Sequence, residues 1–179
     1  MATKNNRDEG RMQRPGDGGR RLVWGAMFGA VIAVTTAYIK VPGVGGYYHL
    51  GDGFIYAGAI LLGPGVAAGA AAIGSLFADF LAGWPAWAVP SFFIKGLTAL
   101  AVGHLARGTR VNIRNLGAMG AGAVVTIVGY SAVAYFLFGE GFALYELYGN
   151  IGQTASGIVL ASALLPLLSR AWTASRRGQ

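Results

Sequence analysis

After a polar stretch of about twenty residues, the chain runs through long apolar segments separated by short polar or aromatic breaks. Segments this apolar, rich in Gly and Ala on every side, predict helices that cross or lie within a membrane. The second segment has only ten residues, about 15 Å of helix, whereas a bilayer needs about 20 residues. It is expected to be tilted, packed inside the bundle, or extended by part of residues 41–52. The six predicted helices cover residues 22–40, 53–62, 66–83, 91–106, 115–138 and 150–169.

The breaks and tails follow from turn residues and polarity. Gly-Pro-Gly at 63–65 ends the second helix, "WPAWAVP" at 84–90 predicts a turn, and 139–149 predicts a polar-aromatic loop. Residues 1–20 are polar, contain Gly and Pro, and predict a disordered basic tail. The apolar segment that follows is too long for a signal-peptide core, so we expect a retained first helix. The predicted division is a tail at 1–20, a six-helix transmembrane domain at 21–172 and a basic tail at 173–179.

Composition supports lipid as the solvent. Of 179 residues, 54% are hydrophobic and 12% are charged, about half the charge density of soluble domains. The chain has 30 glycines, which allow membrane helices to approach closely, and no cysteine. The absence of cysteine excludes disulfides, thiolate metal sites and cysteine nucleophiles. With two histidines in the whole chain, we expect neither a metal site nor a cofactor.

The net charge of +7 could suggest nucleic acid, but the basic residues cluster at the ends of apolar segments. With the N-terminus inside and six crossings, twelve of the fourteen Lys and Arg fall on the cytoplasmic side, in 1–21, 107–114 and 170–177. The outer loops 41–52, 84–90 and 139–149 contain no Lys or Arg. We therefore expect both termini in the cytoplasm, contact with the lipid bilayer and no nucleic-acid partner. Lys40 and Lys95 are the two basic residues left over.

Polar residues gather in the outer third of the predicted bundle. Asp79 and Lys95 both lie roughly 6–8 Å below its outer boundary, where ionisable groups are costly and mark a site by default. Convergence on one side predicts an outward-facing pocket for a small ligand. The candidate substrate-binding residues are Tyr48, His49, Asp52, Asp79, Trp84, Trp87, Lys95, Tyr130, Asn150 and Gln153.

Simpler roles compete for the same residues. Asp79 and Lys95 could neutralise one another as a buried pair, and Asp52 or Asn150 could cap a helix. His49 could be an interfacial hydrogen-bonding residue, and the Tyr and Trp residues could form an ordinary aromatic belt. Asn150 and Gln153, three residues apart, share one helix face.

The first predicted helix carries small residues at four-residue spacing. Ala26 and Ala30, like Gly25 and Gly29, would form a smooth face that another helix can approach. That helix could belong to this bundle or to a partner, and the spacing alone does not separate the two.

Residues 50–97 resemble the substrate-binding S components of energy-coupling factor (ECF) vitamin transporters. The matching features are "LGD" opening a short helix, "GP" at its end, "GS" followed by "AD" (Ala78, Asp79), an aromatic turn and "IKG" around Lys95. "GY" at 129–130 and "NIGQ" at 150–153 extend the match more loosely.

The resemblance implies an all-α integral membrane protein, a six-helix bundle with both termini cytoplasmic, in the plasma membrane of a prokaryote. It implies capture of a vitamin on the outer side in a pocket closed by the first outer loop. It further implies docking, through Ala26 and Ala30, onto a membrane-embedded coupling protein (the T component) driven by two cytoplasmic ATPases. The chain itself has no GxxxxGK[ST] stretch, so we expect no ATP hydrolysis and no catalytic residue.

The motif pattern resembles most closely the branch associated with hydroxymethylpyrimidine, a thiamine precursor, and pyridoxine, with riboflavin as the alternative. Trp84, Trp87 and Tyr130 offer stacking faces for a flat ring, and Asn150 and Gln153 offer donor–acceptor pairs. Two rival functions remain. One is a membrane enzyme using Asp79, His49 and Asp52 as acid–base groups. The other is a structural or assembly subunit of a membrane complex, which would have little reason to place charges in lipid.

Overall fold

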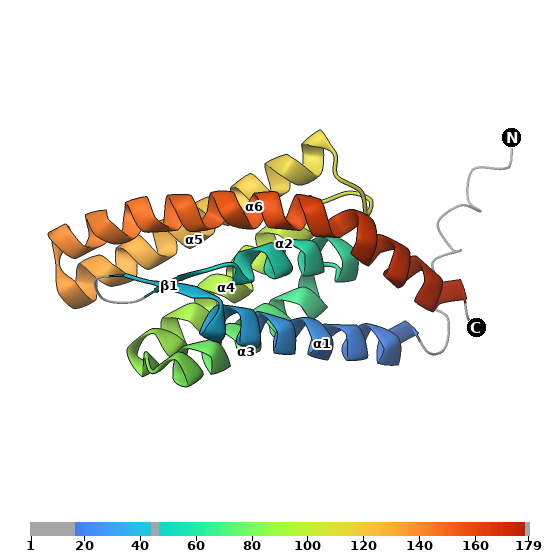
Figure 1. Ribbon diagram of the computed structural model, residues 1–179. Helices are drawn as coiled ribbons and strands as arrows, with labels where there is room; N and C mark the ends of the chain where they lie inside the picture. Colours follow the sequence, from blue (N-terminus) through green and yellow to red (C-terminus); the bar gives the residue numbers. More distant parts are fainter. Residues whose placement is uncertain (1–16, 44–46, 178–179) are drawn as a thin grey trace, which may run out of the picture.

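The computed structural model describes residues 17–43 and 47–177. It is an all-α bundle with one small hairpin, in agreement with the predicted fold class (Figure 1). The elements are α1 (Asp17–Tyr38), β1 (Lys40–Pro42), β2 (Tyr47–His49), α2 (Gly51–Leu62), α3 (Pro64–Ala82), α4 (Pro85–Leu105), α5 (Ile113–Phe138) and α6 (Glu140–Arg177).

Five of these helices are long and apolar enough to cross a membrane. Large apolar side chains such as Phe77, Phe93 and Phe136 are more than half exposed on their outer faces. An outer surface with so many exposed apolar side chains is suited to lipid rather than to water. The chain is therefore a multi-pass membrane protein.

The short helix α2 is packed inside the bundle, one of the three arrangements expected for it. Eleven of its twelve residues are buried, and it contacts α1, α3, α4 and α6. At about 18 Å it is too short to span lipid, but protein surrounds it. Gly63, at φ 79°, makes the sharp turn into α3, and Pro64 begins that helix.

Glycines set the distance between α1 and α3. A Cβ on Gly74 would lie 2.6 Å from the carbonyl oxygen of Gly29, and one on Gly25 would lie 2.6 Å from Val66 Cγ1. Gly25 and Gly29 thus pack within this bundle, while Ala26 and Ala30 stay exposed beside them.

Both ends of the bundle are closed by specific contacts. Near one end, Arg20 Nη1 donates to the Ser175 carbonyl at 3.4 Å and the Trp24 and Trp172 rings lie 5.6 Å apart. The β1–β2 hairpin, the α3–α4 turn and the α5–α6 junction lie together at the other end (Figure 1). In the hairpin Lys40 pairs with His49 and Pro42 with Tyr47.

Four sequence-based boundaries were wrong. Residues 84–90 are not a turn, because Pro85 occupies the first position of α4, where no N–H is needed, and Pro90 is tolerated within that helix. Residues 139–149 are not a loop. Gly139, at φ 89°, is the single non-helical residue between α5, which ends at Phe138, and α6, which begins at Glu140. The N-terminal part of the chain is helical from residue 17, and α6 runs through the expected tail to Arg177. The remaining tail residues, 1–16 and 178–179, lie outside the described part.

Candidate functional site

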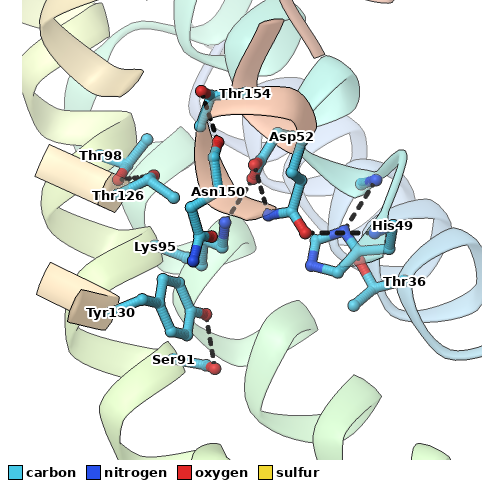
Figure 2. Close-up of polar contacts among 12 residues, drawn as sticks. Thr36, His49, Asp52, Ser91, Lys95, Thr98, Thr126, Tyr130, Asn150 and Thr154 are labelled. Atoms are coloured by element: carbon cyan, nitrogen blue, oxygen red, sulfur yellow. Dashed lines mark hydrogen bonds and ion pairs between the residues drawn. The ribbon is translucent and has the colours of Figure 1, made fainter. Parts of the chain in front are cut away.

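A fully buried ion pair lies at the centre of the polar cluster. Lys95 Nζ on α4 is 2.6 Å from Asp52 Oδ1 on α2, and both side chains are 0% exposed (Figure 2). The suggested pairing of Lys95 with Asp79 was therefore wrong, as was the suggested cap role of Asp52. Asp52 lies in the first turn of α2, but no side chain caps that helix. Its carboxylate is instead held between Lys95 and an amide.

That amide is Gln153 on α6, which joins three elements. Its Nε2 donates to Asp52 Oδ2 at 2.9 Å, and its Oε1 accepts the His49 backbone N–H at 3.1 Å. The buried charge of Asp52 is thus shared by a charged and a neutral donor, as a buried carboxylate requires. Gln153 also fastens β2 to α6.

His49 is neutral in this arrangement. Its Nδ1 accepts the Gly51 backbone N–H at 3.1 Å and lies 3.4 Å from Thr36 Oγ1. Burial, followed by the Lys95 charge, lowers the pKa of His49 to about 3. The ring proton therefore resides on Nε2, which leaves that nitrogen as a donor.

A small cavity of about 30 Å³ lies beside the ion pair. Six of the predicted site residues line it: His49, Asp79, Trp87, Tyr130, Asn150 and Gln153. Lys95 and Asp52 lie behind this lining, with Lys95 Nζ 5.0 Å from the centre of the Tyr130 ring. The structure thus brings together residues from β2, α3, α4, α5 and α6.

Besides Asp52 and Lys95, two further predicted site residues, Tyr48 and Trp84, do not line the cavity. Side chains alternate along a strand, so Tyr48 faces away from Tyr47 and His49. It packs against Tyr145, with ring centres 6.1 Å apart, and against Gly149. Trp84 is half-buried and packs on the aromatic cluster around Trp87.

Three cavity residues were missed: Tyr47, Ser91 and Glu146. Each has a periodicity signal. Tyr47 is two residues from His49 on one strand face, Ser91 is four residues before Lys95 on α4, and Glu146 is four residues before Asn150 on α6. Tyr47 and Glu146 fell in segments predicted as loops, which hid their spacings, whereas Ser91 shared the predicted helix 91–106 with Lys95 and was overlooked.

The cavity has two acidic walls. Asp79 Oδ1 accepts from the Tyr47 hydroxyl at 2.6 Å, while its buried Oδ2 has no hydrogen bond of standard geometry among the described residues and has the Ser91 hydroxyl as a neighbouring donor. Burial and the Asp79 carboxylate raise the pKa of Tyr47, so this phenol stays protonated and donates. Glu146 Oε2 accepts from Asn150 Nδ2 at 2.8 Å. Asn150 is therefore no helix cap, since it lies three turns inside α6.

An aromatic pair completes the lining. The rings of Trp87 and Tyr130 lie 5.7 Å apart at 46°, and the Tyr130 hydroxyl is 2.7 Å from Ser91 Oγ. The cavity thus combines aromatic surface with carboxylate, amide, hydroxyl and imidazole groups. Within residues 17–43 and 47–177, no group of three His, Asp or Glu side chains is arranged to hold a metal ion.

A family model described as "ECF-type riboflavin transporter, S component" matches residues 19–170. This chain belongs to the family of ECF transporter S components. The resemblance inferred from residues 50–97 is confirmed, and the match extends it over most of the chain. A protein of Pyrococcus woesei described as "Uncharacterized protein in gap 3'region" is 37% identical over 141 residues, which cover 78% of this chain and 95% of that protein. The S-component family is one of substrate-binding transporter subunits.

Proposed function

We propose that this S component captures a small water-soluble heteroaromatic vitamin or precursor in the cavity beside Lys95 and Asp52. The observation that carries the proposal is the composition of the lining. All nine of its residues bear a polar side-chain group, the Trp87 indole N–H included, on a protein whose exposed helix faces carry many large apolar side chains. Groups of this kind fix the orientation of a ligand, and Trp87 and Tyr130 offer faces for its ring.

Two types of ligand are candidates for this cavity, and a different observation favours each. The small, polar cavity favours a single ring with polar substituents, of the hydroxymethylpyrimidine or pyridoxine type. The matching family, described as that of riboflavin transporter S components, favours riboflavin. A larger three-ring system would have to place more apolar surface against this polar lining.

Either ligand requires the cavity to widen. Its volume of about 30 Å³ is close to that of one water molecule, whereas small-molecule pockets measure roughly 300–1,000 Å³. The first outer loop is the element that would move, because the three-residue strand β2 is held across the site by a few side-chain contacts. These include the Gln153–His49 and Tyr47–Asp79 hydrogen bonds and the packing of Tyr48 on Tyr145. The loop would then close over the bound ligand.

Delivery follows by docking on a membrane-embedded coupling protein powered by two cytoplasmic ATPases. Ala26 and Ala30 are exposed on α1 and line an apolar groove of about 750 Å³ between α1 and α3. A smooth apolar surface in lipid suits close approach of a partner helix. In this proposal both termini are cytoplasmic, the membrane is a prokaryotic plasma membrane, and the chain carries out no catalysis of its own.

The test is mass spectrometry of small molecules released by denaturing the detergent-purified protein, followed by calorimetry with a vitamin panel. We expect a stoichiometric heteroaromatic compound. Asn150→Ala should weaken its binding by about tenfold or more, since it leaves a buried polar group unpaired. Thr173→Ala, an exposed change on the same helix, should leave affinity unchanged. If no vitamin binds by calorimetry, the proposal is wrong and an assembly-subunit role takes its place.

A further inference from the structure

The charges that face the cavity are unbalanced. Asp79 and Glu146 both line it, and their side chains are 6% and 7% exposed. No basic side chain stands among the nine lining residues. His49, which does line the cavity, is neutral as described above.

The nearest basic residues do not correct this imbalance. Lys95 is fully buried and its charge is met by Asp52 at 2.6 Å, behind the lining. Lys40 is exposed, donates to the Ala82 carbonyl at 3.4 Å, and its ammonium lies 4.9 Å from the Tyr47 ring centre, outside the cavity. Water screens an ammonium in that position.

A second feature shows which ligand groups the walls would accept. Asp79 Oδ2 is buried and has no hydrogen bond of standard geometry among the described residues, with the Ser91 hydroxyl as a neighbouring donor. A buried acceptor that is held this weakly is stabilised by a ligand group that donates to it. Carboxylate oxygens are acceptors for hydroxyl and amino groups. Phosphate sites, by contrast, are built from Arg, Lys or clustered backbone N–H groups, and none of the cavity side chains is Arg or Lys.

We infer that this site selects the free, uncharged or amino-bearing form of its ligand and rejects the phosphate ester. The inference rests on the proposed capture function and specifies the chemical form that is captured. Asp79 and Glu146 are then specificity-determining residues. They accept hydrogen bonds from the free ligand and repel a phosphate dianion brought between them.

The expected discrimination is about 100-fold in Kd. Consider one carboxylate and one unit of phosphate charge about 6 Å apart in a partly buried site. Their repulsion alone is strong enough to weaken binding by about that factor. Desolvation of the phosphate adds to it in the same direction.

The experiment is calorimetric titration of the detergent-purified protein with matched pairs. These are riboflavin and flavin mononucleotide, hydroxymethylpyrimidine and its monophosphate, and pyridoxine and its 5′-phosphate. For whichever free compound binds, its ester should bind about 100-fold more weakly. The Asp79→Asn and Glu146→Gln double variant should reduce that ratio to tenfold or less. Glu140→Gln, an exposed carboxylate at the start of α6, should leave the ratio unchanged.

The outcomes separate the two claims. If a free vitamin binds and its ester binds within tenfold of it, the inference is overturned while the capture function stands. The wild-type ratio decides this even if the double variant does not fold. If the wild-type ratio is large but the folded double variant keeps it, the assignment to Asp79 and Glu146 is wrong. If neither form of any pair binds, the capture function fails and the inference fails with it.

Discussion

Replacing Lys95 by methionine tests the centre of the site. Methionine has a similar length and no charge, so Lys95→Met leaves Asp52 buried without its ionic partner. The two side chains are 0% exposed and 2.6 Å apart, and among the described residues Gln153 still donates a side-chain hydrogen bond to the carboxylate. Breaking a pair of this kind costs about 3–5 kcal/mol.

The loss is measurable by thermal unfolding. One kcal/mol corresponds to about 2–4 °C in a chain of this size, so Lys95→Met should lower the apparent Tm by roughly 6–20 °C. Tryptophan fluorescence, followed during heating in detergent at a fixed scan rate, reports the transition. The scan rate is held constant because unfolding of such proteins is often irreversible.

A second substitution identifies the partner. Asp52→Asn removes the charge but keeps an acceptor for Gln153, so the Lys95→Met, Asp52→Asn double variant should recover at least half of the lost Tm. Asp79→Asn combined with Lys95→Met should recover little of the lost Tm. Unfolding of Lys95→Met within 2 °C of the wild type, or rescue by Asp79→Asn as good as that by Asp52→Asn, would exclude Asp52 as the ionic partner of Lys95.

Three further predictions follow from the packing and the charges. Because the pKa of His49 is about 3 in the folded protein and 6.5 as a free side chain, the unfolded chain alone takes up this proton between those values. Stability should therefore fall as pH drops below 6.5, and His49→Gln should show a smaller Tm loss between pH 7 and 5; equal losses would exclude this role. Gly103→Ala places a Cβ 2.6 Å from Pro64 Cα and should destabilise by about 1–3 kcal/mol in thermal unfolding. Gly117→Ala, with open space around it, should be neutral or stabilising, and a similar loss at both positions would contradict the packing. Ala26→Leu with Ala30→Leu should abolish co-purification with the coupling protein while calorimetry shows unchanged vitamin binding. Ala163→Leu, exposed on α6, is the control, and retained co-purification of the double variant would exclude this docking face.

Much of the architecture was predictable because it depends on local patterns. Runs of apolar residues located all six helices. The second segment was too short to cross a membrane, and burial inside the bundle was one of the three arrangements predicted for it. The predicted helix boundaries were wrong where one residue type is compatible with two local structures. Pro85 can end a helix or begin one, and in this chain it begins α4. The polar residues of 140–149 suggested a loop, although Glu146 belongs to the same helix face as Asn150 and Gln153.

The site was predicted as a group and not as a set of contacts. Depth in the membrane placed Asp79 and Lys95 at one level, but the choice between Asp52 and Asp79 as the partner of Lys95 depends on how α2 packs between α4 and α6. No sequence spacing encodes that choice. The hairpin was missed because its strands have three residues each, too few for an alternating pattern. Tyr48 was consequently chosen where Tyr47 faces the cavity.

We propose that the vitamin binds in the small polar cavity and not in the larger apolar groove between α1 and α3. The most direct measurement is an experimental structure of the detergent-purified protein with its bound compound. We expect a flat ring beside Trp87 and Tyr130, with polar atoms within hydrogen-bond distance of Asn150 and Asp79. A vitamin bound in the groove beside Ala26 and Ala30, with the polar cavity still collapsed, would contradict this proposal.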